Sequence, residues 1–268
     1  MKYILIIFSI SIIACNSSSD PAIPATDSLQ QLLQSIRDSI KKYPDDPKPK
    51  YNLAIVLQDA GRYKDAVLAL DSLNISKGDS ANARLYFNYL FKRAELLELA
   101  GDRNEAIKTL ELFVVPGELT QAGLQLTNLY AETKNPKAIT FSDAMKKNDA
   151  SGKDPNPDYL KGVYYYNMGD YKNALAQFEE CIRKDYHFID AYMEKGRIFY
   201  NQEKYSESLA VFDLALTVSN SYADAFFWKA KCQQALGQNQ EAKLNYQRAF
   251  GLDKSFTEAK DSADRIKN

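Results

Sequence analysis

The fold is indicated by three related segments, GDYKNALAQF at 169–178, EKYSESLAVF at 203–212 and GQNQEAKLNY at 237–246. Each is a short turn followed by the start of a helix-period segment, and each begins 34 residues after the one before it. A fixed period of this length is typical of a stacked array of helix pairs, in which every unit packs only on its neighbours. An array of this kind offers a long surface and no built-in catalytic group.

The period divides this part of the chain into three units, 155–188, 189–222 and 223–256. Small residues recur where the two helices of a unit must touch, and a large apolar residue follows four places later to fill the space beside them. The small residues are Gly162, Gly196 and Ala230 in the first helices and Ala174, Ser208 and Ala242 in the second, and the large residues are Phe178, Phe212 and Tyr246.

This pattern resembles the tetratricopeptide repeat, written W-x2-L-G-x2-Y, then A-x3-F, then P. Unit 189–222 matches it at Tyr192, Gly196, Phe199, Ser208 and Phe212, whereas the closing proline is missing from all three units. The resemblance implies an all-α fold, a right-handed α-solenoid of antiparallel helix pairs. The alternative is a run of antiparallel helices without a repeat.

The repeat extends upstream over the rest of 27–268. Related turns begin at Gly61 and Gly101, which predicts repeats at about 47–80 and 87–120 with an insertion near 77–82. Two periods separate Gly101 from Gly169, so a degenerate repeat at 119–152 is expected, with its turn at Asn135-Pro136. Residues 27–43 resemble the second half of an earlier repeat, and 257–267 a polar capping helix.

The N-terminus reads as an export signal, MKYILIIFSISIIAC. Lys2 supplies a positive start, the apolar stretch to Ala14 is short for a permanent membrane span, and 1–14 are predicted to be removed. The last four residues resemble the lipobox of Gram-negative, Bacteroidota-like lipoproteins, which implies lipidation of Cys15 with acyl chains such as palmitate. The alternative is a plain secretory signal with an incidental cysteine. Residues 15–26, Ser- and Pro-rich, are predicted to be a flexible tether.

In the tetratricopeptide family the first helices of successive repeats line a concave face, to which the fifth, ninth and twelfth places of each repeat usually point. The resemblance therefore implies a partner-binding groove, with aromatic anchors and basic groups suited to a peptide. The alternative is that several of these aromatics pack against the neighbouring repeat. The groove residues are Tyr159, Val163 and Tyr166, then Met193, Arg197 and Tyr200, then Phe227, Lys231 and Gln234.

Two other basic patterns bear on the partner. The carboxylate clamp of chaperone-binding relatives needs Lys and Asn at the fifth and ninth places, and this chain does not match it. A basic residue also occupies the seventh place, where the family usually has leucine. The aliphatic stems of these basic side chains are expected to cover apolar surface while the charges reach water. The alternative is that the row forms a site for an acidic partner. These residues are Arg93, Lys161, Lys195 and Lys229.

The sequence lacks the usual signatures of catalysis and of metal or nucleotide binding. It has no P-loop, GxSxG, HExxH or CxxC motif, and one histidine, His187, in an expected turn. We therefore expect no enzyme activity, no cofactor and no metal, and the net charge of -1 gives no reason to expect nucleic-acid binding. Cys181 and Cys232 are separated by a whole repeat, so two buried free thiols are predicted.

Together these features predict a membrane-anchored interaction scaffold of the cell envelope. Its partner would be an envelope protein or peptide, and its membrane the outer membrane, at the periplasmic face or the cell surface. The alternative is a surface lipoprotein that captures glycans or nutrients, for which exposed, coplanar tyrosines would be expected.

Overall fold

A computed structural model describes residues 27–73 and 83–266, with the side chains of 83–85 left undescribed. Fourteen α-helices and no strand occur in these residues, in agreement with the all-α prediction. The signal, Cys15, the tether and the expected insertion near 77–82 lie outside the described residues. Two compact units divide within the sixth helix.

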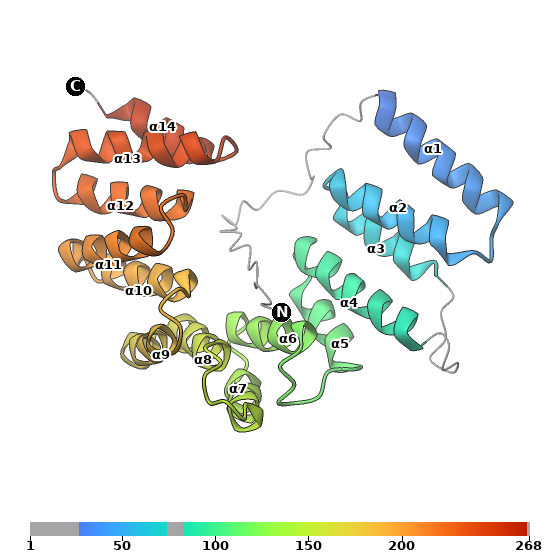
Figure 1. The fold of residues 1–268 in the computed structure, drawn as a ribbon. Coiled ribbons are helices and arrows are strands. Elements are labelled where there is room, and N and C mark those ends of the chain that lie inside the picture. The colour runs from blue at the N-terminus through green and yellow to red at the C-terminus, as the bar shows by residue number, and fades with distance from the viewer. Residues whose placement is uncertain (1–26, 74–82, 267–268) are drawn as a thin grey trace. The chain divides into compact units, whose positions relative to one another are not determined.

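Unit 1 comprises the first five helices and the start of the sixth (Figure 1). Its helices pack as successive neighbours. They are α1 (Asp27–Lys42), α2 (Pro47–Asp59), α3 (Tyr63–Asp71), α4 (Ala83–Leu99) and α5 (Arg103–Glu111), followed by α6 (Gln121–Glu132). Helix α4 begins before Phe87, the expected start of its repeat, since Ala, Arg and Leu are good helix formers that extend it upstream.

Unit 2 contains the end of α6 and the remaining helices, which stack in the order of the sequence (Figure 1). Each repeat contributes a first and a second helix, and the last helix covers the end of the stack. The helices are α7 (Lys137–Asn148), α8 (Asn156–Asn167), α9 (Tyr171–Lys184), α10 (Ile189–Asn201), α11 (Tyr205–Val218), α12 (Ala223–Ala235), α13 (Asn239–Leu252) and α14 (Thr257–Arg265).

The turn between the two helices of each repeat uses one residue in the left-handed conformation. Glycine occupies this place four times, because it lacks the Cβ that makes a positive φ costly. Lys134 and Glu203 adopt the same conformation, with φ of 59° and 60°. Lys134 immediately precedes the Asn135-Pro136 turn expected for the degenerate repeat. The glycines are Gly61, Gly101, Gly169 and Gly237, with φ between 70° and 83°.

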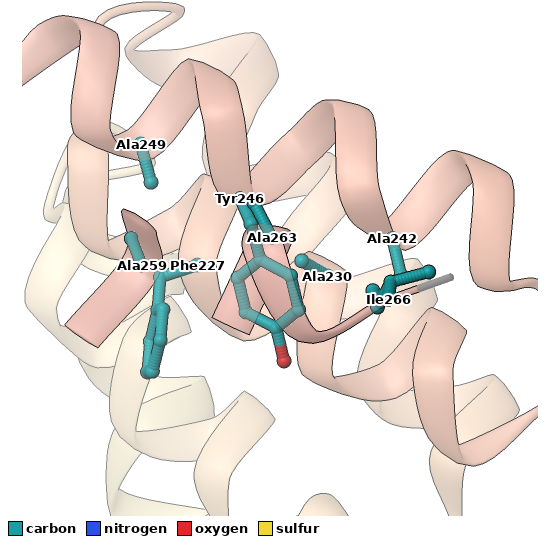
Figure 2. Packing of buried hydrophobic residues seen from close by; sticks show 8 residues of the cluster. All are labelled: Phe227, Ala230, Ala242, Tyr246, Ala249, Ala259, Ala263 and Ile266. Carbon is teal, nitrogen blue, oxygen red and sulfur yellow. The ribbon is translucent and has the colours of Figure 1, made fainter. Parts of the chain in front are cut away.

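The small residues lie where the sequence placed them, between paired helices. A Cβ added to Gly196 would meet the ring of Phe212 at 2.6 Å, and one added to Gly162 would overlap the ring of Phe178. At the C-terminal end, α14 covers the last pair: Ala259 and Ala263 of α14, with Ile266 just after it, pack in one cluster with Phe227 and Tyr246 (Figure 2). Each aromatic ring therefore fills the space left by a small residue on the partner helix.

Candidate ligand-binding face

The fifth-place residues of the expected groove lie in the core. Tyr159, Met193 and Phe227 are only 5%, 2% and 5% exposed. The ring of Tyr159 packs on Phe178 and Phe188, and that of Phe227 on Tyr246 and Phe256. These three residues are therefore buried and do not line an open groove, because the second helix of their own repeat packs against this place.

The ninth and twelfth places keep part of their surface. Val163, Tyr166, Arg197, Tyr200 and Lys231 are half-buried, and Gln234 is exposed, with its side-chain oxygen accepting a hydrogen bond from Tyr246 at 2.9 Å. We call the surface of α8, α10 and α12 that carries Tyr166, Arg197, Tyr200, Trp228 and Lys231 the first-helix face. Its side chains touch one another from repeat to repeat.

Arg197 is held at the centre of the first-helix face. Its Nη1 pairs with Oε1 of Glu194, one turn earlier on α10, at 2.7 Å, and both side chains are 14% exposed. Its guanidinium also lies 5.3 Å from the centre of the Trp228 ring on α12, within cation–π range. Arg197 therefore connects two successive repeats.

Lys231 is surrounded by aromatic rings. Its Nζ lies 4.5 Å from the ring centre of Trp228 and 5.4 Å from those of Tyr200 and Phe227. The Tyr200 and Trp228 rings meet edge to face, with centres 5.4 Å apart. The three rings hold the ammonium group in place without a carboxylate pairing with it among the described residues.

Tyr166 extends the face onto α8. Its hydroxyl accepts a hydrogen bond from Nδ2 of Asn201 at 3.3 Å, which joins one repeat to the next. Burial and the charge of Glu194 raise the pKa of Tyr166, and burial raises that of Tyr200, so both hydroxyls stay protonated and can donate.

Three acidic residues on this face were missed by the sequence reasoning. Asp190 and Glu194 lie on α10 and Asp224 on α12, and burial raises the pKa of all three, that of Asp190 to about 6. The signal was present: Asp190 and Glu194 precede Arg197 by seven and three residues, which places them on its side of the helix. The predicted groove was drawn from the fifth, ninth and twelfth places of each repeat, and these three acids occupy other places.

The seventh-place basic row pairs within the chain. Each member contacts an acid on the second helix of the preceding repeat, and that acid always occupies the twenty-fifth place. The seventh-place basic side chains therefore pair with acids of the same chain, whereas the alternative drawn from the sequence was a site for a separate acidic partner. The pairs are Arg93–Asp71 at 2.7 Å, Lys161–Asp143 at 2.9 Å, Lys195–Glu179 at 3.0 Å and Lys229–Asp213 at 2.6 Å.

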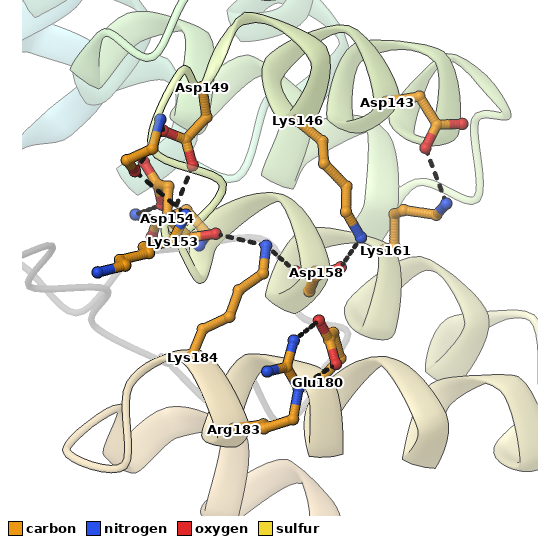
Figure 3. Close-up of polar contacts among 12 residues, drawn as sticks. Asp143, Lys146, Asp149, Lys153, Asp154, Asp158, Lys161, Glu180, Arg183 and Lys184 are labelled. Carbon is orange, nitrogen blue, oxygen red and sulfur yellow. Dashed lines mark hydrogen bonds and ion pairs between the residues drawn. The ribbon is translucent and has the colours of Figure 1, made fainter.

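A second polar cluster joins the degenerate repeat to the one after it (Figure 3). Asp158 at the start of α8 is fully buried, and its carboxylate lies 2.8 Å from Lys146 of α7 and 2.6 Å from Lys184 of α9. Lys184 also donates to the backbone oxygen of Asp154 at 3.0 Å. All groups of this cluster are used in packing three helices together, which indicates a structural role.

The remaining candidates for chemistry are isolated. Cys181 and Cys232 are buried and free, as predicted; burial raises the pKa of both thiols, that of Cys232 to about 11. His187 is exposed in a turn, 3.6 Å from Asp185. The described residues hold no group of three or more His, Cys, Asp or Glu side chains fit for a metal ion. None of their helices is both long and apolar enough to cross a membrane.

Models of the tetratricopeptide repeat match three stretches of the chain, residues 159–225, 223–256 and 89–114. The chain contains tetratricopeptide repeats. The matches cover the three regular repeats of unit 2, except the first residues of the first one, and part of the second repeat of unit 1. The repeats predicted at 47–80 and 119–152 lie outside these matches and stay predictions.

Solved structures with tetratricopeptide repeats share the fold. A tetratricopeptide repeat protein from Parabacteroides merdae is 16% identical over 90% of this chain and 93% of its own, with a TM-score of 0.68. Yeast Tom70 is 16% identical over 89% of this chain and 51% of its own, with a TM-score of 0.62. Cut9, in a complex with Hcn1, is 13% identical over 90% and 46%, with a TM-score of 0.52. A search of curated proteins found no match.

Proposed function

We propose that this protein is a scaffold of the cell envelope that binds a peptide or protein segment on the first-helix face. The observation that carries the proposal is the arrangement of Arg197, Tyr200, Trp228 and Lys231. These side chains are held in place by one another and still keep part of their surface, so a partner would meet groups that are already positioned. Among similar folds, Cut9 is described in a hetero-tetramer with Hcn1.

Anchoring through Cys15 is the second part of the proposal. The charged start, the short apolar stretch and the cysteine that closes it support a lipidated N-terminus, with 16–26 as the tether. Two or more acyl chains would hold the protein stably on a membrane. We propose the outer membrane. In this scheme the repeats carry out binding, without an enzymatic reaction or a cofactor.

Glycan capture is less well supported by the tyrosine geometry. The rings of Tyr200 and Tyr205 cross at 65°, and those of Tyr164 and Tyr165 at 68°. A sugar ring stacks on a flat, exposed aromatic surface, which these pairs do not offer. A peptide can use tilted rings as separate anchors.

Site-specific photo-crosslinking in native envelopes tests the binding face. A photoreactive phenylalanine analogue at Tyr200 is expected to give one discrete adduct with an envelope protein. The same analogue at Leu214, which is 54% exposed on α11, is the control for nonspecific contact. Equal adducts from both positions, or none from Tyr200, would contradict the proposed face.

A substitution identifies the groups that bind. Lys231→Gln should weaken the Tyr200 adduct, whereas Lys172→Gln on the exposed surface of α9 should leave it unchanged. Arg197→Glu is a poor choice because it would place a fourth carboxylate beside Asp190, Glu194 and Asp224.

For the anchor, Cys15→Ser should abolish labelling by a palmitate analogue and release the protein from the membrane fraction. Retained labelling would refute lipidation at Cys15.

A further inference from the structure

The first-helix face concentrates negative charge around one cation. Asp190 and Glu194 on α10 and Asp224 on α12 interact with the charge of Arg197, which pairs directly with Glu194 at 2.7 Å. Asp190 accepts a hydrogen bond from the hydroxyl of Tyr222, just before α12, at 3.2 Å. Asp190 thus connects α10 to the start of the next repeat.

The surroundings of Asp190 hold more acid than base. The groups that interact with it come from α8, α9, α10, the residue before α12, and α12 itself. One of them, Arg197, is a cation, and the neutral members are two tyrosines and a thiol. The groups are Tyr159, Cys181, Glu194, Arg197, Tyr222 and Asp224.

We propose that this cluster is a proton-sensitive element of unit 2, which takes up a proton at Asp190 in mildly acidic solution and is stabilised by it. Protonation removes the repulsion between Asp190 and the carboxylates of Glu194 and Asp224. It also changes the charge of the four groups, three carboxylates and one guanidinium, from two negative charges to one. The carboxylates of α10 and α12 then repel one another less across the contact between the two repeats.

The direction of the effect follows from the folded and unfolded pKa values. Burial, with added repulsion from Glu194 and Asp224, raises the pKa of Asp190 from 3.8 to about 6, and outweighs the hydrogen bond from Tyr222 and the charge of Arg197, which lower it. The folded chain therefore holds this proton more tightly than the unfolded chain does. The stabilisation is complete below pH 3.8 and is lost as the pH rises through 6. Between pH 7 and pH 5 these values correspond to a gain of about tenfold in the folding equilibrium constant.

A consequence concerns partner binding and rests on the proposed function. The same face would be less negative in acid, so binding of a charged segment there would change between pH 7 and pH 5. The test of the proton-sensitive element needs no partner. Its failure is therefore distinguishable from the failure of the proposed function.

Denaturant unfolding of the full chain, followed by the fluorescence of Trp228, tests the proposal. Trp228 is the single tryptophan and lies 5.3 Å from the Arg197 guanidinium, so its signal reports the unit that holds the cluster. Wild type, Asp190→Asn and the control Asp213→Asn are compared at pH 7 and pH 5. Asp213 is exposed and pairs with Lys229, so the control removes a carboxylate of the same unit outside the cluster.

The expected result is a pH response that Asp190→Asn lacks. Other carboxylates titrate in all three proteins, so the difference between wild type and Asp190→Asn isolates Asp190, at about tenfold in the folding constant. Asp213→Asn should keep the wild-type response. Identical responses in wild type and Asp190→Asn would overturn the proposal.

A direct measurement covers the case in which Asp190→Asn does not fold. The side-chain carboxyl carbon of Asp190 in the wild-type chain is followed by NMR across the pH range. A titration midpoint close to 6 supports the proposal. A midpoint close to that of an ordinary aspartate overturns it, since the carboxylate would then be charged throughout the mildly acidic range.

Discussion

At the scale of single residues, glycine has two different uses in these repeats. Gly196 lies inside a helix, where its missing side chain lets the ring of Phe212 approach. Gly169 and Gly237 lie at turns, with φ of 78° and open space around the absent Cβ. A substitution therefore fails for steric reasons at the first kind of position and for conformational reasons at the second.

Gly196→Ala should destabilise unit 2 by about 1–2 kcal/mol. The added methyl group overlaps the Phe212 ring, which costs about 1–3 kcal/mol, and the better helix propensity of alanine returns up to about 1 kcal/mol. Gly251→Ala in α13 is the matched control, because its added Cβ meets nothing within 4 Å apart from its chain neighbours and the helix's own backbone. It should leave stability unchanged or raise it. Trp228 fluorescence in denaturant measures both, and equal effects would contradict steric overlap.

Glu203→Gly should stabilise the chain by about 0.5–1 kcal/mol. Glu203 occupies the left-handed turn position at φ 60°, where a side chain costs about 1 kcal/mol and glycine costs little. The greater freedom of glycine in the unfolded chain reduces the gain. Gly237→Ala makes the opposite change at an equivalent turn and should destabilise. A Glu203→Gly variant that is less stable than wild type would show that the Glu203 side chain contributes more stability than the left-handed turn conformation costs.

At the scale of helices, the joint between α7, α8 and α9 depends on one buried carboxylate. Asp158 is the shared partner of Lys146 and Lys184, and Lys184 is 5% exposed. Removing one member of a buried ion pair leaves its partner without compensation, which is more costly than the net value of the pair. Helix α7 is thus joined to α8 and α9 by charge as well as by packing.

Asp158→Asn should lower the free energy of unfolding of unit 2 by about 3 kcal/mol. Asp143→Asn breaks the neighbouring pair with Lys161, whose acid is 55% exposed, and should cost less than about 1 kcal/mol. Denaturant unfolding monitored by Trp228 compares the two variants. Similar losses would mean that burial of Asp158 does not determine its contribution.

At the scale of the whole molecule, the seventh-place ion pairs repeat along the stack. A solenoid gains stability from its repeats and from the contacts between neighbours, so a small term at each junction adds to the total. The four pairs connect the second helix of one repeat to the first helix of the next. Three of them occur in successive junctions of unit 2.

A double-mutant cycle on Lys195 and Glu179 should show coupling of about 0.5–1 kcal/mol, since the lysine is partly buried and the glutamate exposed. Lys195→Glu combined with Glu179→Lys should recover most of the loss of either single change. High salt should weaken the coupling by screening the exposed partner. Additive single effects would show that the pair contributes no net attraction.

The amino-acid sequence was enough to predict the repeat, the helix pairs, the turn positions and the small residues facing Phe178 and Phe212. These features depend on local propensity and on spacing along one helix, which a period of 34 residues displays directly. The two buried thiols were predictable for the same reason. Cys181 and Cys232 take places in the repeat that face other helices.

Which residues of a helix face stay open depends on how the helices pack, and the sequence could not show this. Spacing placed Tyr159, Met193 and Phe227 on the same side as Arg197, but the second helix of the same repeat packs against the fifth place and leaves the ninth partly exposed. Position along a helix gives the direction of a side chain, whereas burial depends on what another helix places against it. The grouping of Asp190, Glu194 and Asp224 around Arg197, and the pairing of the seventh place with the twenty-fifth, depend in the same way on contacts between repeats.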